Sequence, residues 1–345
     1  MEKDKKTYPG SCPGTAQDKR ISIIGTGSFV PSKVLTNAYF ESIVDTSDEW
    51  IVTRSGIKER RQMDEKMATS DMCFEAAKKA LEAANIKAED LDVIIIGTVT
   101  PDHPFPSTAC YLQSRLGAKN AAAFDVSAAC CGFMYSFTVG TRLMLGSNYK
   151  YALVIGSESL TKITDYKDRG TCVLFGDGAG AVVLHSGQVG SGHEIIYTYV
   201  GADGNGTHLL YQPAGGSRNP SSHKTVDERG HCVKLKGREV YKFAVTKMSD
   251  LVRKAVEECG LTLDDIKLIV PHQVNLRILE AAAERLKFPM ERVFVNIHKY
   301  GNTSSASVPI AFDEVTRSDK LQKGDIAVLV AFGGGLTWGS AVVRW

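Results

Sequence analysis

Three places in the sequence combine a strand-like run with a residue type that can take part in covalent or acid–base chemistry. In the first, AFDVSAACCGFMYSF, the run ends after Val126 at small residues, and Cys130 and Cys131 begin an apolar, helix-like stretch. Backbone N–H groups and the helix dipole at such a start favour a thiolate over a thiol. We expect one cysteine to be a nucleophile; a pair of packed core cysteines is the alternative.

The other two places carry a histidine and an asparagine. His272 follows the apolar run IKLIVP, at the carboxyl end of a predicted strand, where α/β proteins usually bind their ligands. Asn302 follows Gly301 in VFVNIHKYGNTSSAS, after a second predicted strand and before a serine-rich helix start. A structural histidine and an ordinary helix N-cap are the simpler interpretations. Together with a cysteine, however, these residue types form sites for nucleophilic catalysis.

The chain around these residues is predicted to be an internal duplication. KALEAANIKAEDLDVIIIGT, from Lys79, matches KAVEECGLTLDDIKLIVPHQ, from Lys254, at a shift of 254 − 79 = 175 residues. RLGAKNAAAFDV then matches RLKFPMERVFVN, and GDGAGAVVL matches LTWGSAVVR, in the same order. Alternating helix-period and strand-period stretches predict an α/β fold with two buried sheets that sandwich helices. Equivalent strands of two copies would bring all three places to one interface.

We divide the chain into a flexible N-terminal extension, residues 1–20, and two halves, residues 21–187 and 188–345. The opening residues are polar and partly acidic, which is typical of neither a secretory signal nor an organelle transit peptide. Residues 193–238 are rich in glycine, serine and asparagine. They are predicted to form hairpins and loops that wall a site and do not enter the core.

The composition narrows the class of protein. Of 345 residues, 41 are Lys or Arg and 39 are Asp or Glu, so the net charge is 41 − 39 = +2, and 43% are hydrophobic. These values are typical of globular proteins and argue against a nucleic-acid binder. No apolar run approaches the roughly 20 residues that span a bilayer. The eight cysteines include no CxxC pair, so we expect free thiols in the cytoplasm and neither a zinc site nor a disulfide framework.

Two glycine motifs have the spacing of a dinucleotide site, GTGSFV at Gly25 and GDGAGA at Gly176. Such a site needs glycines that open a helix directly after a strand. Gly25 instead leads to Pro31, and Gly176 leads into the strand-like run AVVL. The motifs therefore do not indicate a dinucleotide cofactor.

Several long motifs resemble one enzyme family. AFDVSAACCGF, VPHQVNLRI, YGNTSSASVP and AFGGGLTWGSAVVRW are similar to the signatures of β-ketoacyl-acyl carrier protein synthase III, the initiating condensing enzyme of bacterial type II fatty acid synthesis. DTSDEWIVTRSGIKER and DRGTCVLFGDGAGA extend the resemblance over residues 21–345. The resemblance implies a thiolase-like fold, an internally duplicated five-layered αβαβα sandwich, which agrees with the repeat. It also implies a homodimer.

The resemblance assigns roles to the three candidate residues. Cys130 would be the acylated nucleophile, completed by His272 and Asn302, with the N–H groups of Cys130 and Gly334 as the oxyanion hole. Cys130 would take a short acyl group, preferably from acetyl-CoA. Malonyl-acyl carrier protein would then lose CO₂ to give an enolate, stabilised by His272 and Asn302, that attacks the acyl-cysteine. The products would be 3-oxoacyl-acyl carrier protein, CoA and CO₂, and no metal or other cofactor is implied.

Further binding residues follow from the same resemblance. Trp50 and Arg169 would sandwich the adenine of CoA, with Thr46, Arg54 and Asn275 nearby. Phe105 would reach across the dimer and close the partner's acyl pocket, which favours a short primer. The other acyl-pocket residues would be Leu160, Phe175 and Phe332. Residues expected to meet the carrier protein are Lys242, Gln273, Val274, Asn275, Leu276, Arg277 and Arg285.

The sequence departs from the family pattern at two positions. Glu284 stands where some relatives carry a basic residue, which affects the expected docking of the carrier protein. Cys131 stands where alanine is common. Adjacent helical residues point about 100° apart, so only one of the two sulfurs should face a substrate, and the motif favours Cys130.

Three alternatives stay open. A thiolase-fold condensing enzyme of polyketide or secondary metabolism, or a homologue specific for acyl-CoA, would share the three catalytic residues. A Cys-His-Asn thioester hydrolase of papain type would also use them, although the local cysteine-protease signature is missing. A non-catalytic dimeric binding protein is the third alternative, and the intact residues at all three places argue against it.

Overall fold

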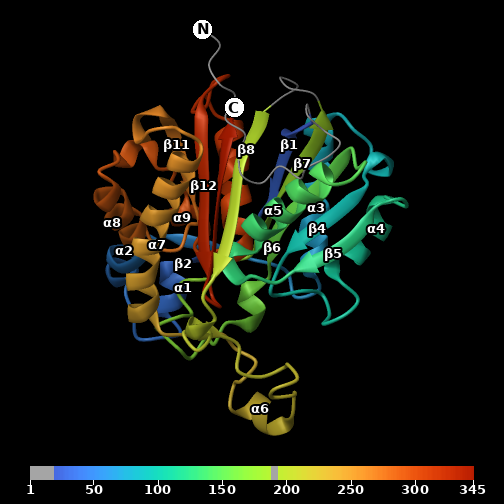
Figure 1. The fold of residues 1–345 in the computed structure, drawn as a ribbon. Coiled ribbons are helices and arrows are strands. Elements are labelled where there is room, and N and C mark those ends of the chain that lie inside the picture. Colours follow the sequence, from blue (N-terminus) through green and yellow to red (C-terminus); the bar gives the residue numbers. More distant parts are fainter. Residues whose placement is uncertain (1–18, 188–192) are drawn as a thin grey trace.

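Two half-sheets of the same topology lie at the centre of the computed structural model, which describes residues 19–187 and 193–345 (Figure 1). Most of the predicted extension, residues 1–20, and Cys12 therefore lie outside the described residues, and Arg20 already begins β1. The predicted boundary between residues 187 and 188 falls at the edge of the undescribed segment 188–192, and the division into halves stays a prediction.

The first half-sheet has the order β5-β4-β6-β7-β1. Strands β4, β5 and β6 are parallel. Of these, β4 and β6 are nearly continuous apolar runs, as expected for strands covered on both faces. The bounds are β1 (Arg20–Phe29), β4 (Val93–Gly97), β5 (Ala122–Val126), β6 (Tyr151–Glu158) and β7 (Gly178–Gly187). Helices α3 (Thr69–Ala84) and α4 (Thr108–Leu116) cover its outer face.

The second half-sheet repeats four of these five positions, from β4 to β1, as β11-β12-β13-β8. Its strands are β8 (His193–Ala202), β11 (Ile266–Pro271), β12 (Ile326–Gly333) and β13 (Thr337–Arg344). Helices α7 (Gly237–Glu258) and α8 (Leu276–Leu286) cover its outer face. Two residue pairs, Ser22 with Glu194 and Ile23 with His193, join β1 to β8, so that the two predicted sheets form one nine-stranded sheet.

The middle layer consists of α5 (Gly132–Leu145) and α10 (Ser307–Thr316). Both helices are apolar on most faces because each packs between the two half-sheets. Phe133 and Phe137 of α5 and Phe312 of α10 belong to one core cluster with strands of both halves. The layers are therefore helix, sheet, helix, sheet, helix, which confirms the predicted αβαβα sandwich.

Smaller elements surround one end of the sandwich. They comprise β2 (Lys33–Thr36), α1 (Asn37–Glu41), α2 (Asp48–Ser55), β3 (Glu59–Gln62), β9 (Leu210–Tyr211), α6 (His223–Asp227), β10 (Lys234–Leu235) and α9 (Ile297–Tyr300). The segment that carries α6 extends away from the body, below the sheet in Figure 1.

Two sequence-based expectations about local structure were wrong. Residues 193–202, expected among hairpins and loops, form β8, which lies inside the sheet between β13 and β1. Glu194, Tyr197 and Tyr199 of EIIYTYV are half-buried, whereas Thr198 is buried, and the polar residues of this run concealed a long central strand. The run VFVN, expected to be a strand, makes only a single bridge, from Val293 to Ile269 of β11.

Two equivalent turns start the central helices and display the duplication directly. Turn η2 (Ala129–Cys131) precedes α5, and turn η7 (Ser304–Ala306) leads into α10. Each turn begins with a residue in the left-handed region, Ala129 and Ser304, both with φ of 48°. Their separation, 304 − 129 = 175 residues, equals the shift found in the sequence. Non-glycine residues in this region cost about 1–3 kcal/mol and are often found at functional sites.

We expect Gly156→Ala to destabilise the protein because β6 and turn η7 approach each other closely at this position. A Cβ atom on Gly156 would lie 2.2 Å from the carbonyl oxygen of Ser305, and overpacking of this kind costs roughly 1–3 kcal/mol. Urea unfolding followed by circular dichroism measures the loss. Gly204→Ala is the matched control, since a Cβ there meets no atom within 4 Å; equal stability of the two variants would contradict the prediction.

Candidate active site

One cavity of about 630 Å³ is lined by all three candidate residues, Cys130, His272 and Asn302. Cys130 comes from the first half of the chain and the other two come from the second half. The cavity opens beside Trp50 and Arg54 of α2. The fold therefore brings the three candidate residues to one place, as expected from the sequence.

Turn η2 positions Cys130, which is 8% exposed. Gly333, at the end of β12, packs directly against this turn: a Cβ there would lie 2.7 Å from the backbone nitrogen of Cys130. Cys131 is fully buried, and its Sγ lies 3.7 Å from the carbonyl oxygen of Ala331. Only Cys130 lines the cavity, in agreement with the expectation that one of the two sulfurs faces it.

The resting state of Cys130 differs from the expected thiolate. Burial raises the pKa of the Cys130 thiol to about 12, although hydrogen bonds from the Ser304 side chain and the residue's own backbone oppose the rise. The cysteine is therefore a thiol at neutral pH. The helix start does not overcome the cost of burying a charge, so the thiol must lose its proton to another group in order to react.

His272 presents a neutral imidazole to the cavity. Its backbone N–H donates to the carbonyl oxygen of Val330 (2.8 Å), which fixes the residue at the end of β11. Burial lowers the pKa of His272 to about 3. Neither ring nitrogen has a hydrogen-bond partner within the described part of the chain, and the ring packs edge-on against Phe332 at 5.8 Å. The imidazole can therefore donate a hydrogen bond to a substrate without carrying a charge.

Asn302 is held by its backbone and oriented by its side chain. Its N–H donates to Leu174 (2.9 Å), and its carbonyl oxygen accepts from Gly176 (3.0 Å). The side-chain oxygen Oδ1 accepts from the N–H of Ser304 (2.8 Å). Because Oδ1 is engaged, the amide group Nδ2 is the part of the side chain left to act as a donor in the cavity.

Gly334, the predicted second member of the oxyanion hole, lines the same cavity as Cys130. It follows Gly333 at the end of β12 and packs beside turn η2, where a Cβ on Gly334 would lie 3.5 Å from that of Ala129. The pairing of its N–H with that of Cys130 stays a prediction.

The predicted adenine site is closed in this structure. The Arg169 guanidinium lies 5.1 Å from the centre of the Trp50 ring, and Arg54 lies 5.5 Å from the same ring. Arg169 also pairs with Asp45 at 2.9 Å. A base between Trp50 and Arg169 would require the arginine to swing away and give up both contacts.

Two further predicted CoA residues lie around this site. Asn275 lines the cavity and caps α8: its Oδ1 accepts from the N–H of Arg277 (2.9 Å), and its Nδ2 donates to the carbonyl oxygen of Arg54 (2.8 Å). Thr46 is half-buried, and its hydroxyl has no partner within residues 19–187 and 193–345. Asn275 therefore ties the second half of the chain to α2.

The predicted acyl-pocket residues occupy three different environments. Phe175 and Phe332 line the cavity. Leu160 packs behind Phe175 in a small apolar cluster that includes Val233. Phe105 lies outside this cavity, with 85% of its surface exposed.

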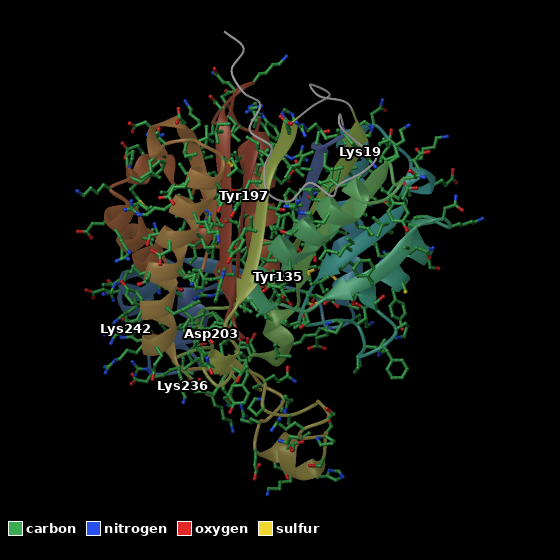
Figure 2. All side chains as sticks on the ribbon, in the orientation of Figure 1. Lys19, Tyr135, Tyr197, Asp203, Lys236 and Lys242 are labelled. Carbon is green, nitrogen blue, oxygen red and sulfur yellow. The ribbon has the colours of Figure 1, made fainter. Side chains whose placement is uncertain are left out.

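The residues predicted to contact the carrier protein also differ in their exposure to solvent. Lys242 and Arg277 are exposed and line the mouth of the cavity, whereas Val274 and Leu276 are half-buried. Figure 2 places Lys242 and Lys236 at the end of the molecule from which the α6 segment extends. The exposed guanidinium of Arg285 contacts α7, through Ser249 at 2.9 Å and Asp250 at 3.6 Å.

Gln273 differs from its predicted docking role because it is buried, with 1% exposed. Its Oε1 accepts from the N–H groups of Asn296 and Ile297, and its Nε2 donates to the carbonyl oxygens of Pro271 and Phe294. All the polar atoms of its side chain thus hold the loop before Asn302, and none is presented to a partner.

Sequence analysis missed two polar residues near Cys130, namely Glu158 and Ser304. Glu158 ends β6, fully buried, and Ser304 begins turn η7. The Ser304 hydroxyl donates to Glu158 at 3.1 Å. An acid that directly ends the apolar run YALVIGS was the available indication, since a buried carboxylate needs partners.

Within the described residues, no group of three or more His, Cys, Asp or Glu side chains is arranged to hold a metal ion. A search of the same residues finds no helix with the length and apolar character needed to cross a membrane.

Comparisons with known proteins agree with this geometry. The family described as 3-Oxoacyl-[acyl-carrier-protein (ACP)] synthase III matches residues 124–204, and its C-terminal part matches residues 256–345. Beta-ketoacyl-[acyl-carrier-protein] synthase III of Caldanaerobacter subterraneus is 56% identical over 323 residues, covering 94% of this chain and 97% of that protein. The protein of the same name from Clostridioides difficile is 50% identical over 326 residues, covering 94% and 98%.

Solved structures give the same result. The crystal structure of 3-oxoacyl-[acyl-carrier-protein] synthase III from Aquifex aeolicus has a TM-score of 0.86 and 45% identity, covering 94% of this chain and all of that one. The priming β-ketosynthase of the R1128 polyketide pathway has a TM-score of 0.87 and 32% identity, covering 96% and 99%.

The sandwich and these relatives define a thiolase-like condensing enzyme, which is an acyltransferase. The chain belongs to the β-ketoacyl-acyl carrier protein synthase III family, the enzymes of the initiating condensation in fatty acid synthesis.

We expect Cys130→Ser to abolish acyl transfer, because a serine hydroxyl is far harder to ionise than a thiol and is a weaker nucleophile. Cys131→Ser is the matched control and should keep most of the activity, since its sulfur points into the core. Mass spectrometry of peptides after brief exposure to acetyl-CoA locates the acyl group. Its appearance on Cys131 would overturn the assignment.

Proposed function

We propose that this protein condenses a short acyl-CoA, preferably acetyl-CoA, with malonyl-acyl carrier protein to give 3-oxoacyl-acyl carrier protein, CoA and CO₂. The observation that carries the proposal is the meeting of Cys130, His272 and Asn302 in one cavity. A nucleophile and two uncharged hydrogen-bond donors are the groups that a decarboxylative Claisen condensation requires.

The first half-reaction forms a covalent acyl-enzyme. Cys130 loses its proton, and its sulfur attacks the thioester carbonyl of the acyl-CoA. The N–H groups of Cys130 and Gly334 stabilise the negative oxygen of the tetrahedral intermediate. The carbon–sulfur bond to CoA then breaks, and CoA leaves along the mouth of the cavity between α2 and α8.

The second half-reaction needs donors without a charge. His272 and Asn302 donate hydrogen bonds to the thioester carbonyl of the malonyl group, which becomes an enolate when CO₂ leaves. A neutral imidazole suits this role, and the pKa of His272, lowered to about 3 by burial, keeps it neutral at any pH where the fold is expected to work. The enolate carbon then attacks the acyl-cysteine carbonyl and releases Cys130.

The positive charge of the surface near the mouth of the cavity suits acidic or phosphorylated substrates. Four basic residues line it: Arg54, Arg238, Lys242 and Arg277. Guanidinium groups suit the phosphates of CoA, and the same charges attract an acidic carrier protein. We include Trp50 and Arg169 in the CoA site, with Arg169 moving to admit the adenine.

We also propose a homodimer. Strand β5 lies at the edge of the sheet and leaves backbone groups unpaired on its outer side. Beside it, the exposed Phe105 precedes α4, and Tyr111 of α4 is 38% exposed. A second copy that covers this edge would bury both rings and carry Phe105 toward the partner's acyl pocket.

Incubation of the purified chain with labelled acetyl-CoA and malonyl-acyl carrier protein, followed by mass analysis, tests the proposal. A 3-oxobutyryl-carrier protein supports it. Release of free acetate without CO₂ would instead indicate a hydrolase. Condensation only with malonyl-CoA, or only with a carrier protein of a polyketide pathway, would place the enzyme in secondary metabolism, where one structural relative belongs.

His272→Ala and Asn302→Ala should separate the two half-reactions. Both side chains act on the malonyl thioester, so each change should lower decarboxylation by at least about 10²-fold, as for a lost oxyanion donor. Acylation of Cys130 should be affected less, because it uses backbone donors. Release of labelled CO₂ and the mass of the acyl-enzyme measure the two steps. Loss of acylation with intact decarboxylation would contradict these roles.

Phe105 should limit the length of the primer. A phenyl ring at the end of the partner's pocket fills the volume that a long chain needs, and overpacking costs roughly 1–3 kcal/mol. We expect kcat/KM to be higher for acetyl-CoA or isobutyryl-CoA than for decanoyl-CoA, and Phe105→Thr to shift the preference toward longer chains. Tyr111→Thr, on the same exposed surface, is the matched control. A wild-type preference for decanoyl-CoA would be incompatible with this role.

A further inference from the structure

Glu158 is a buried carboxylate next to the site that the steps above do not use. It has no exposed surface and ends β6. Its Oε2 accepts from the N–H of Val99 (3.1 Å) and from the hydroxyl of Thr100 (2.7 Å), and its Oε1 accepts from the hydroxyl of Ser304 (3.1 Å). Burial raises the pKa of Glu158 to about 7, although these donors oppose the rise. The carboxylate can therefore take up a proton near neutral pH.

Ser304 joins this carboxylate to the catalytic residues. Its backbone N–H donates to Oδ1 of Asn302 (2.8 Å) and its hydroxyl donates to Glu158. Turn η7, which begins with Ser304, packs against turn η2, which carries Cys130, and the Ser304 side chain lowers the pKa of the Cys130 thiol. A serine hydroxyl has one proton to donate. It can donate to the carboxylate or to a thiolate, but not to both at once.

Cys130 needs such a proton acceptor. Its thiol is protonated at rest, and the neighbouring His272 is a weak base because burial lowers its pKa to about 3. A thiolate formed beside an ionised Glu158 would place two negative charges in one buried site, and the charge of Glu158 is itself a cause of the raised pKa of Cys130. If the thiol proton moves to Glu158, only one charge remains.

We propose that Glu158 accepts, through Ser304, the proton that Cys130 loses when it becomes a nucleophile. This inference rests on the proposed function, in which Cys130 is acylated. The proton on Sγ of Cys130 passes to Oγ of Ser304 while the hydroxyl proton of Ser304 passes to Oε1 of Glu158. The thiol thus becomes a thiolate and the carboxylate becomes a carboxylic acid. The pair carries one negative charge both before and after the transfer. Ser304 then donates to the thiolate, and Glu158 donates to Ser304.

The acylation step that follows is balanced. The thiolate electron pair forms the bond to the acyl carbon, and the bond from that carbon to the CoA sulfur breaks. The CoA thiolate takes a proton from solvent, and Glu158, which is itself buried, gives up the proton that it accepted from Cys130. Overall, the proton of the Cys130 thiol leaves the site, the departing CoA thiolate gains one proton, and Glu158 is again a carboxylate.

The other titratable groups near Glu158 are not linked to Cys130 through Ser304. Cys73 of α3 interacts with Glu158 and also with Asp102 and Asp125, but burial raises the pKa of Cys73 far above its ordinary value. Burial also raises the pKa of Asp125, which lies on β5 and accepts from the N–H groups at the start of α4. None of these groups hydrogen bonds to Ser304 in the described residues, so the link to Cys130 belongs to Glu158.

The test measures the rate at which iodoacetamide alkylates Cys130 in the full-length protein at pH values between about 5.5 and 9. Mass spectrometry of the Cys130 peptide gives the extent of alkylation. In the wild type, the rate should rise about tenfold per pH unit up to about pH 7 and then level. Above that pH the pair shares a single proton, and the fraction present as thiolate becomes constant. In Glu158→Gln the rate should keep rising above pH 7 because the thiol titrates alone.

Two more variants separate this mechanism from a purely structural role. Glu158→Asp restores an ionisable acid and should restore the levelling. Ser304→Ala removes the hydroxyl but keeps the N–H that holds Asn302, and it should lose the levelling. Ser305→Ala is the matched control on the same turn; its hydroxyl is buried without a partner in the described chain, and its profile should equal that of the wild type.

The outcomes are decisive. A wild-type rate that keeps rising through pH 7, or levelling that survives in Glu158→Gln, would overturn the proposal, and levelling that survives in Ser304→Ala would overturn the route through Ser304. Circular dichroism checks that each variant is folded, and the aspartate and alanine variants keep the test valid if the glutamine variant unfolds. Alkylation needs neither acyl-CoA nor carrier protein, so a failure of the proposed function would appear separately, in the condensation assay.

Discussion

The packing of turn η2 against turn η7 is the contact on which the site depends. Each turn starts a central helix, and each begins with a residue in the left-handed region, so neither can shift without moving a helix that both half-sheets cover. Gly156 lets η7 approach β6 because no side chain intervenes. Cys130 on one turn and the loop that carries Asn302 before the other are thereby fixed relative to each other.

Burial then determines the charge state of the site. It raises the pKa of Cys130 and lowers that of His272, so the resting site holds a thiol and a neutral imidazole. Uncharged donors in a low-dielectric cavity stabilise a developing negative charge more strongly than solvated ones do. The same environment makes it costly to ionise the thiol, and Glu158 is the nearby group whose protonation can compensate for that cost.

Much of this arrangement could be predicted from the sequence, because the duplication has a constant shift and the three candidate residues each follow an apolar run. Strand β8 could not be recognised, since its polar alternation is also typical of a surface hairpin and its neighbours, β1 and β13, are distant in sequence. The buried position of Gln273 depends on four backbone groups that no local pattern reveals. The thiol state of Cys130 was missed because a helix start indicates the local dipole but says nothing of the depth of burial.

The origin of the site in two halves of one chain has a consequence for its biosynthesis. A ribosome completes the half with Cys130 long before the half with His272 and Asn302 emerges. Until then α5 lacks the sheet that covers its second face, and the apolar residues Phe133 and Phe137 stay open to non-specific association. Cys130, His272 and Asn302 can meet only once the second half has docked, so an incomplete product of translation carries Cys130 without the other two residues.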